Sequence, residues 1–178
     1  MRVPARALSA AIVVLGASLG GGAARAEPPR EMFGGASIGF GTSSRPSGCP
    51  NYCSRTWGPA LEGSLGWMVG ESVAVRGDLW LHSNVDETLA AVVMAGPQLW
   101  LGGGASVRVA LGGGGFTTHN ADGGPGAGAG GALAITGSYE LWRGGTSSSE
   151  LELRAMVLAT TDIGYVSFAF AGYAVRWD

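Results

Sequence analysis

Apolar residues alternate with small or polar residues along most of the chain after residue 30, and this period of two constrains the fold more than any other feature. Successive side chains of a β-strand point to opposite faces, so the alternation predicts strands with one apolar face. Phe168 and Phe170 fall on the parity opposite to Tyr173, Val175 and Trp177, which predicts a β-bulge in the last segment. The eight alternating segments are 33–42, 57–69, 72–82, 88–101, 105–115, 127–142, 150–160 and 164–177.

Composition and connection lengths agree with a β protein. The chain has 33 glycines, and a glycine inside a helix costs about 1 kcal/mol relative to alanine. Short glycine- or serine-rich connections alternate with longer, irregular ones, although the connections at 83–87 and 161–163 are short for this pattern. The predicted fold class is all-β, an eight-stranded antiparallel up-and-down barrel. The short connections are 69–72, 101–104 and 143–149, and the long ones are 43–56 and 116–126.

The first 26 residues have the layout of a cleaved secretory signal peptide. Arg2 and Arg6 precede the apolar run 7–19, and Ala24-Arg25-Ala26 offers a small-x-small cleavage site. An uncleaved membrane anchor is the alternative, but the apolar run is short and ends in glycines. We therefore expect a signal peptide at 1–26 and one barrel domain at 27–178.

Cleavage would leave a mildly acidic chain. Eight arginines would remain against 13 acidic residues, a net charge of −5, and the chain contains no lysine. No basic stripe remains, so binding to nucleic acid is not expected.

The placement of charge indicates which face of the barrel points inward. All charges within the predicted strands share one parity, and the rest of that face is mostly Gly, Ala, Ser and Thr. Such a face is a poor water-exposed surface, whereas small residues and nearly balanced charges suit the narrow interior of an eight-stranded barrel. We expect an interior charge network made of Glu62, Arg76, Asp78, Arg108, Glu140, Glu150, Glu152, Arg154 and Arg176.

The opposite, apolar face would then contact lipid, with a soluble barrel as the alternative. Segments of 9–11 residues are long enough to cross a bilayer when tilted. Aromatic residues near the ends of the apolar face are typical of the girdles of transmembrane barrels. The predicted aromatic girdle comprises Trp57, Trp67, Tyr139, Tyr173 and Trp177.

Cys49 and Cys53 are the only cysteines. An exported chain meets an oxidising compartment, so a small disulfide within the loop 43–56 is the preferred interpretation and two free thiols are the alternative. Two ligands do not complete a tetrahedral metal site, and no metal or other cofactor is expected.

The pattern over residues 31–177 resembles the small outer-membrane β-barrel superfamily that includes the OmpA transmembrane domain, OmpX and OmpW. Gly172, Val175 and Trp177 stand at the spacing of the family's C-terminal assembly signal, although Asp178 follows where the family usually ends on its aromatic residue. The resemblance implies a location in the bacterial outer membrane, contact with its lipid and insertion by the barrel assembly machinery.

Catalytic chemistry has little support in the sequence. His82-Ser83-Asn84 resembles part of a motif of outer-membrane lipid A deacylases, but neighbouring strand residues point to opposite faces, so His82 and Ser83 would diverge. The leading hypothesis is a non-enzymatic, Gram-negative outer-membrane protein that contributes to membrane integrity or surface interaction, with ligand contacts at loops 43–56 and 116–126. A porin-like narrow channel or lateral path for a small solute is the main alternative. A lipid-modifying hydrolase and a soluble periplasmic carrier follow it.

Overall fold

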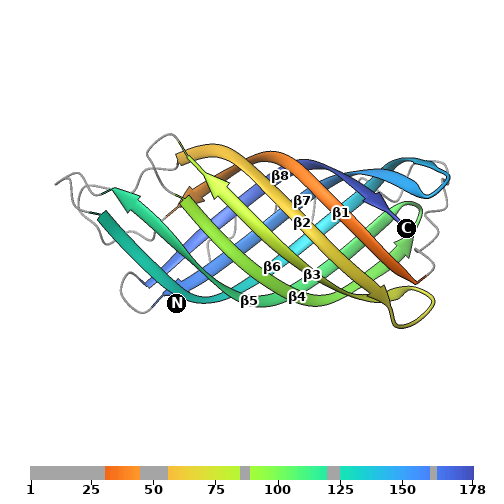
Figure 1. The fold of residues 1–178 in the computed structure, drawn as a ribbon, viewed down its shortest axis with the longest axis horizontal. Coiled ribbons are helices and arrows are strands. Elements are labelled where there is room, and N and C mark those ends of the chain that lie inside the picture. Colours follow the sequence, from red (N-terminus) through yellow and green to blue (C-terminus); the bar gives the residue numbers. More distant parts are fainter. Residues whose placement is uncertain (1–30, 45–55, 85–88, 120–124, 161–163) are drawn as a thin grey trace.

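The computed structural model describes residues 31–44, 56–84, 89–119, 125–160 and 164–178, which form eight strands (Figure 1). These are β1 Met32–Ser44, β2 Thr56–Met68, β3 Val73–Ser83, β4 Leu89–Gly102, β5 Ala105–His119, β6 Pro125–Gly144, β7 Ser147–Thr160 and β8 Gly164–Trp177.

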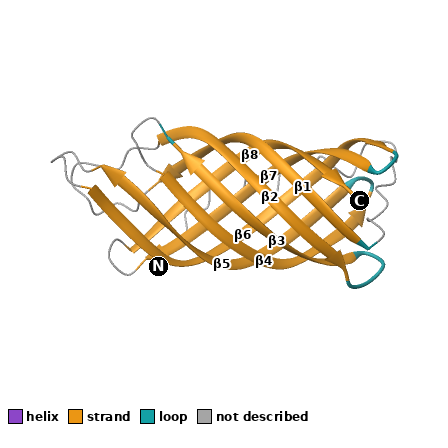
Figure 2. Cartoon of the chain, in the orientation of Figure 1, coloured by secondary structure: helices purple, strands orange, loops and turns teal. Residues whose placement is uncertain are grey.

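Each strand pairs antiparallel with the strands before and after it, and β8 returns to pair with β1. The sheet therefore closes into an up-and-down barrel with no free edge, as predicted, and the strands cross its long axis at a marked tilt (Figure 2). In the part of the chain that the structure describes, no apolar helix of membrane-spanning length is present.

The three described turns join β2 to β3, β4 to β5 and β6 to β7, and they lie together with the C-terminal residue at one end of the barrel (Figure 1). We call this the turn end, and the opposite end, where β1 ends and β2 begins, the loop end. Gly102, the last residue of β4, has φ of 81°, and Gly103 and Gly104 in the β4–β5 turn have φ of 62° and 87°. Gly145 has φ of 59° in the β6–β7 turn. Residues other than glycine rarely adopt this left-handed backbone conformation.

The strands are longer at several ends than the sequence predicts. β5 and β6 take up parts of the expected loop 116–126, and β6 and β7 shorten the expected turn 143–149 to residues 145–146. Both strand extensions have the same cause. Glycine, serine and threonine are typical of turns, but here they lie in strands, because their backbone groups pair with the neighbouring strand.

The predicted bulge in β8 is wrong. β8 pairs in continuous register with both β1 and β7, so Phe168 and Phe170 point into the barrel. The expectation failed because it took the parity of Tyr173, Val175 and Trp177 as the one apolar face of the segment, whereas both faces of β8 carry aromatic residues. Register shifts occur instead between Trp100 and Gly102 in β4 and between Glu140 and Trp142 in β6.

Glycine lets neighbouring strands approach closely where they coil around the interior. At seven positions in the strands, an added Cβ would overlap the backbone of an adjacent strand, so no side chain fits there without moving that strand. These positions are Gly39, Gly58, Gly96, Gly112, Gly114, Gly130 and Gly172.

The seam that closes the barrel, between β1 and β8, combines glycine with aromatic side chains. On the outer face, the Trp177 indole occupies the space that a Cβ at Gly34 would need. On the inner face, the Phe170 ring does the same for Gly39 and Gly172. Each ring therefore packs across the seam and protects backbone that glycine leaves uncovered.

Alanine at neighbouring positions 130 and 131 should have opposite effects on stability. Gly130→Ala pushes a methyl group into the backbone of β7 and should lower the free energy of unfolding by about 1–3 kcal/mol. Gly131→Ala meets nothing within 4 Å and should leave stability unchanged or raise it by up to about 1 kcal/mol. Urea titration of the refolded variants measures both values, and equal losses would contradict the close approach of β6 and β7.

Candidate functional site

The interior of the barrel is the strongest candidate for a functional site, because it gathers nearly all the charge of the strands. Within the described strands, the side chains of all nine residues expected to form a charge network are buried on the inner face. They separate into two groups along the barrel axis.

The first group, the central cluster, consists of Glu62, Arg76, Asp78, Arg108, Glu152 and Arg154. Its three carboxylates balance its three guanidinium groups, which is how buried charge is ordinarily tolerated.

Arg154 is the hub of the central cluster. Its guanidinium donates to Glu62, to Asp78 Oδ2 at 3.3 Å and to Glu152 Oε1 at 2.9 Å. β7 and β2 are not neighbours in the sheet, so the Arg154–Glu62 pair crosses the lumen. Arg76 also spans the lumen. Its Nη2 lies 2.6 Å from Glu62 Oε1 on β2 and 3.7 Å from Glu152 Oε2 on β7.

Neutral side chains extend the cluster along the wall. Gln98 Oε1 accepts from Arg76 at 3.4 Å, and its amide donates to Ser106 at 2.9 Å. Ser106 hydrogen-bonds to Ser138 at 2.8 Å, and Thr136 accepts from Arg154 Nε at 3.1 Å. The network thus links side chains on strands β2, β3, β4, β5, β6 and β7.

The second group, the turn-end cluster, lies nearer the turns. Arg176 donates to Glu150 and to Glu140 Oε2 at 3.2 Å, and its guanidinium carbon lies 5.8 Å from the centre of the Trp100 ring. Arg143, which the sequence analysis left in a turn, lies in β6 and donates to Glu140 Oε2 at 2.8 Å. The bulge after Glu140 is the local irregularity that sequence periodicity did not reveal.

The loop half of the interior is mostly apolar, with Ser43, His82, Asn84 and Thr160 also buried there. Trp80 stands beside Glu62 in the β2–β3 register, and Phe170 stands beside Arg154 in the β7–β8 register, so the apolar layer begins at the level of the central cluster. This layer was not expected from the sequence, because the inward face beside the charges is mostly Gly, Ala, Ser and Thr. The layer also contains Val92, Met94, Phe116, Met156, Leu158, Val166 and Phe168.

His82 belongs to this apolar layer and not to a catalytic pair. Its ring is 1% exposed, stacks on Trp80 with centroids 5.4 Å apart, and meets the edge of Phe168 at 5.9 Å. Ser83 is exposed on the outer face, so the two side chains lie on opposite sides of the wall.

The outer wall is apolar around the barrel. In the described strands, its exposed residues include many Leu, Val and Ile side chains, and Arg143 alone among the charged strand residues is partly exposed, at its turn-end tip.

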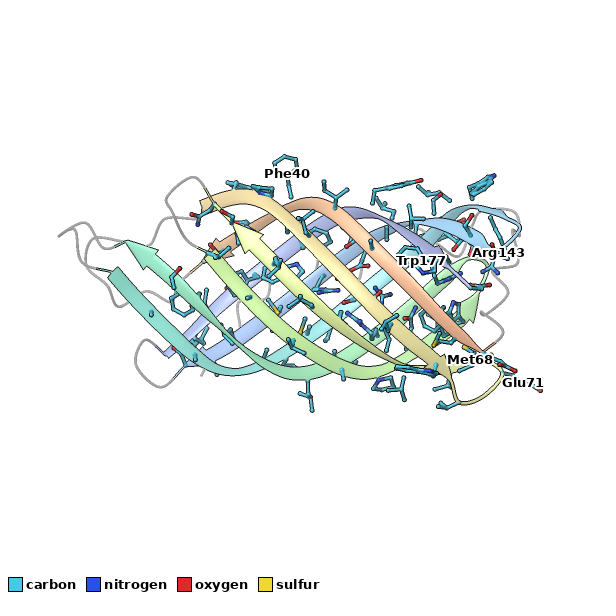
Figure 3. All side chains as sticks on the ribbon, in the orientation of Figure 1. Phe40, Met68, Glu71, Arg143 and Trp177 are labelled. Atoms are coloured by element: carbon cyan, nitrogen blue, oxygen red, sulfur yellow. The ribbon has the colours of Figure 1, made fainter. Side chains whose placement is uncertain are left out.

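Aromatic side chains on the outer wall stand near both ends of the barrel. Phe40 projects from the wall of β1, and Trp177 lies toward the turn end (Figure 3). Of the residues expected in a girdle, Trp57 is near the loop end and the other four are nearer the turn end. Three further aromatic residues that were not expected in the girdle are also exposed: Phe40, Trp142 and Tyr165.

The remaining predicted sites divide between described and undescribed residues. Val175 and Trp177 of the expected assembly signal face outward on β8, and Gly172 lies under the Phe170 ring at the seam. Cys49, Cys53 and the signal segment 1–26 lie outside the described residues.

Removing the hub of the central cluster should be costly. Arg154→Met leaves three buried carboxylates with too few cations and should lower the free energy of unfolding by about 3–5 kcal/mol. Arg143→Met removes one pair whose arginine side chain is 24% exposed and should cost about 1 kcal/mol or less. Urea unfolding of both variants tests this, and similar losses would show that the central cluster has no special weight.

Several solved structures share the fold of this chain. No protein-family model matches the chain, and no curated protein matches it. Neisserial surface protein A is 10% identical, with a TM-score of 0.69 over 85% of this chain and 99% of that one. Ail, the attachment invasion locus protein of Yersinia pestis, solved with the heparin analogue sucrose octasulfate, is 16% identical, with a TM-score of 0.55 over 83% of this chain and 100% of its own.

The N-terminal β-barrel domain of Pseudomonas aeruginosa OprF is 12% identical, with a TM-score of 0.52 over 84% of this chain and 100% of that domain. At these identities the likeness concerns architecture, and it agrees with the resemblance expected from the strand pattern. The chain has the closed eight-stranded fold of the small outer-membrane β-barrels.

Proposed function

We propose that this protein spans the bacterial outer membrane as a closed, non-enzymatic β-barrel and contributes to membrane integrity or surface interaction. The observation that carries the proposal is the inverted distribution of polarity: charge inside the barrel and an apolar wall outside. Water favours the opposite arrangement, so the outer wall suits a hydrocarbon solvent.

Closure of the sheet also supports a hydrocarbon environment for the outer wall. In hydrocarbon every backbone N–H and C=O must be paired within the protein, and a closed antiparallel ladder pairs them without an exposed edge. Aromatic rings near both ends of the wall suit the two interfaces between hydrocarbon and water. Together these features support a barrel that crosses the membrane with its long axis near the membrane normal.

The packing of the interior supports a lumen that does not conduct. The central cluster crosses the lumen through Arg154–Glu62 and Arg76–Glu152, and the apolar layer covers it on the loop side. A solute would have to break buried ion pairs and displace aromatic rings to pass. The charged residues then serve to fill and neutralise the interior, a structural role that needs no substrate.

The two ends of the barrel suit different surroundings. The short turns at the turn end suit the periplasmic side of the membrane. The segments that connect the strands at the loop end suit the cell surface. We assign surface interaction to the segments within 43–56 and 116–126, and contact with the barrel assembly machinery to β8 through Gly172, Val175 and Trp177. The heparin analogue is bound in the structure of Ail, and we assign no such ligand to this chain.

Fractionation of the native host tests the location. The protein should be recovered with the outer membrane, and its band on an SDS gel should migrate differently before and after boiling, because a closed barrel resists unfolding by detergent at room temperature. An abundant periplasmic protein serves as the control for leakage. Recovery in the soluble periplasm would refute the membrane proposal and support a soluble carrier.

Planar bilayers test the closed lumen. The purified protein should insert without producing single-channel steps, because the central cluster and the apolar layer fill the lumen. A general porin added to the same bilayers provides the positive control. Reproducible steps from this protein would favour the narrow-channel alternative over the closed barrel.

A further inference from the structure

The outer wall carries a shallow hollow of about 480 Å³ over strands β4, β5 and β6. A larger one, of about 720 Å³, lies over strands β2, β3, β4 and β5. Gly63 and Gly77 have no side chains and form its floor. In the register, Gly63 lies opposite Leu79, and Gly77 lies opposite Leu65 and Ala95. The larger outward side chains that line it are Leu65, Trp67, Leu79, Val93 and Leu111.

The fold does not require the two glycines of the floor. A Cβ at Gly63 would meet nothing within 4 Å, and one at Gly77 would meet only the Met94 carbonyl oxygen at an ordinary 3.7 Å. Neither residue has a positive φ. Gly112 and Gly130 differ, since neighbouring backbone excludes any side chain there.

Glycine weakens a strand and often marks a place where another group approaches closely. Gly131 and Gly137 are equally open, but they do not line this hollow, whereas Gly63 and Gly77 both do. Their missing side chains within one hollow therefore point to an occupant outside the chain. Its chemistry follows from the lining, since the side chains of Ser64 and Asp78 turn inward and the outward lining is apolar. Among the residues that line the hollow, the one charged side chain, Asp78, is buried on the inner face, so none is placed to hold a polar headgroup.

We propose that this hollow binds an acyl chain of a membrane lipid more persistently than the rest of the wall does. The inference rests on the proposed membrane location. A flexible hydrocarbon chain can enter between the leucine and tryptophan side chains and reach the glycine floor. A second copy of the barrel fits less well, because two symmetric hollows would meet rim to rim and leave both floors uncovered.

Photolabelling of the reconstituted full barrel tests the proposal. The protein is placed in phosphatidylcholine vesicles that contain a small fraction of phosphatidylcholine with a diazirine on one acyl chain, and labelled residues are mapped by mass spectrometry after irradiation. We expect Leu65, Leu79 and Val93 to be labelled several-fold more than Ile135 and Leu151, which are exposed on the far strands of the same wall.

Matched variants locate the effect. Gly77→Leu fills the hollow and should remove the excess labelling. Gly137→Leu adds the same side chain to β6, also where a Cβ meets nothing within 4 Å, and should leave the excess unchanged. Only variants that keep a heat-modifiable band are compared, and Gly63→Leu replaces Gly77→Leu if that variant does not fold.

Each outcome is decisive. Even labelling around the wall, or an excess that Gly77→Leu does not alter, would overturn the proposal. Labelling that avoids the hollow while covalent dimers form would overturn it in favour of a second copy. No labelling anywhere, together with protein that does not float with the vesicles, would instead refute the membrane location on which the inference rests.

Discussion

Pairing of the backbone is the constraint on which the rest of the structure depends. The apolar wall cannot offer hydrogen bonds to peptide groups, so the ladder between β8 and β1 must close as completely as the other seven. Closure with eight strands fixes a narrow interior. That narrow interior in turn decides which residues can point inward and how closely the strands can approach.

Two solutions fill this interior, one in each half. In the turn half, arginines reach across the lumen to carboxylates on distant strands, so that opposite walls are tied by charge. In the loop half, aromatic and aliphatic side chains fill the space, and glycines on β5 and β6 bring the strands close together. The two halves meet where Trp80 and Phe170 stand beside Glu62 and Arg154.

Much of this fold could be predicted from the sequence because alternation reports directly on the two faces of a strand. Eight strands, their order and the inward side of the charges followed from it. Alternation could not reveal which arginine meets which carboxylate, since Arg154 and Glu62 are far apart in sequence and on strands that do not pair. It also misled at Phe168 and Phe170, because apolar residues on both faces give no contrast between inside and outside.

The absence of that contrast has a consequence for the chain before it becomes a barrel. Segments such as Leu89–Met94 and Ala155–Ala159 carry apolar residues on both faces, so neither face can be turned toward water. An exported, unfolded chain would expose these stretches in an aqueous compartment, where strand-forming segments that lack charge associate with one another. The apolar residues that fill the finished barrel therefore leave its unfolded precursor prone to associate with other copies. The precursor must be kept separate from them until β8 pairs with β1 and the barrel closes.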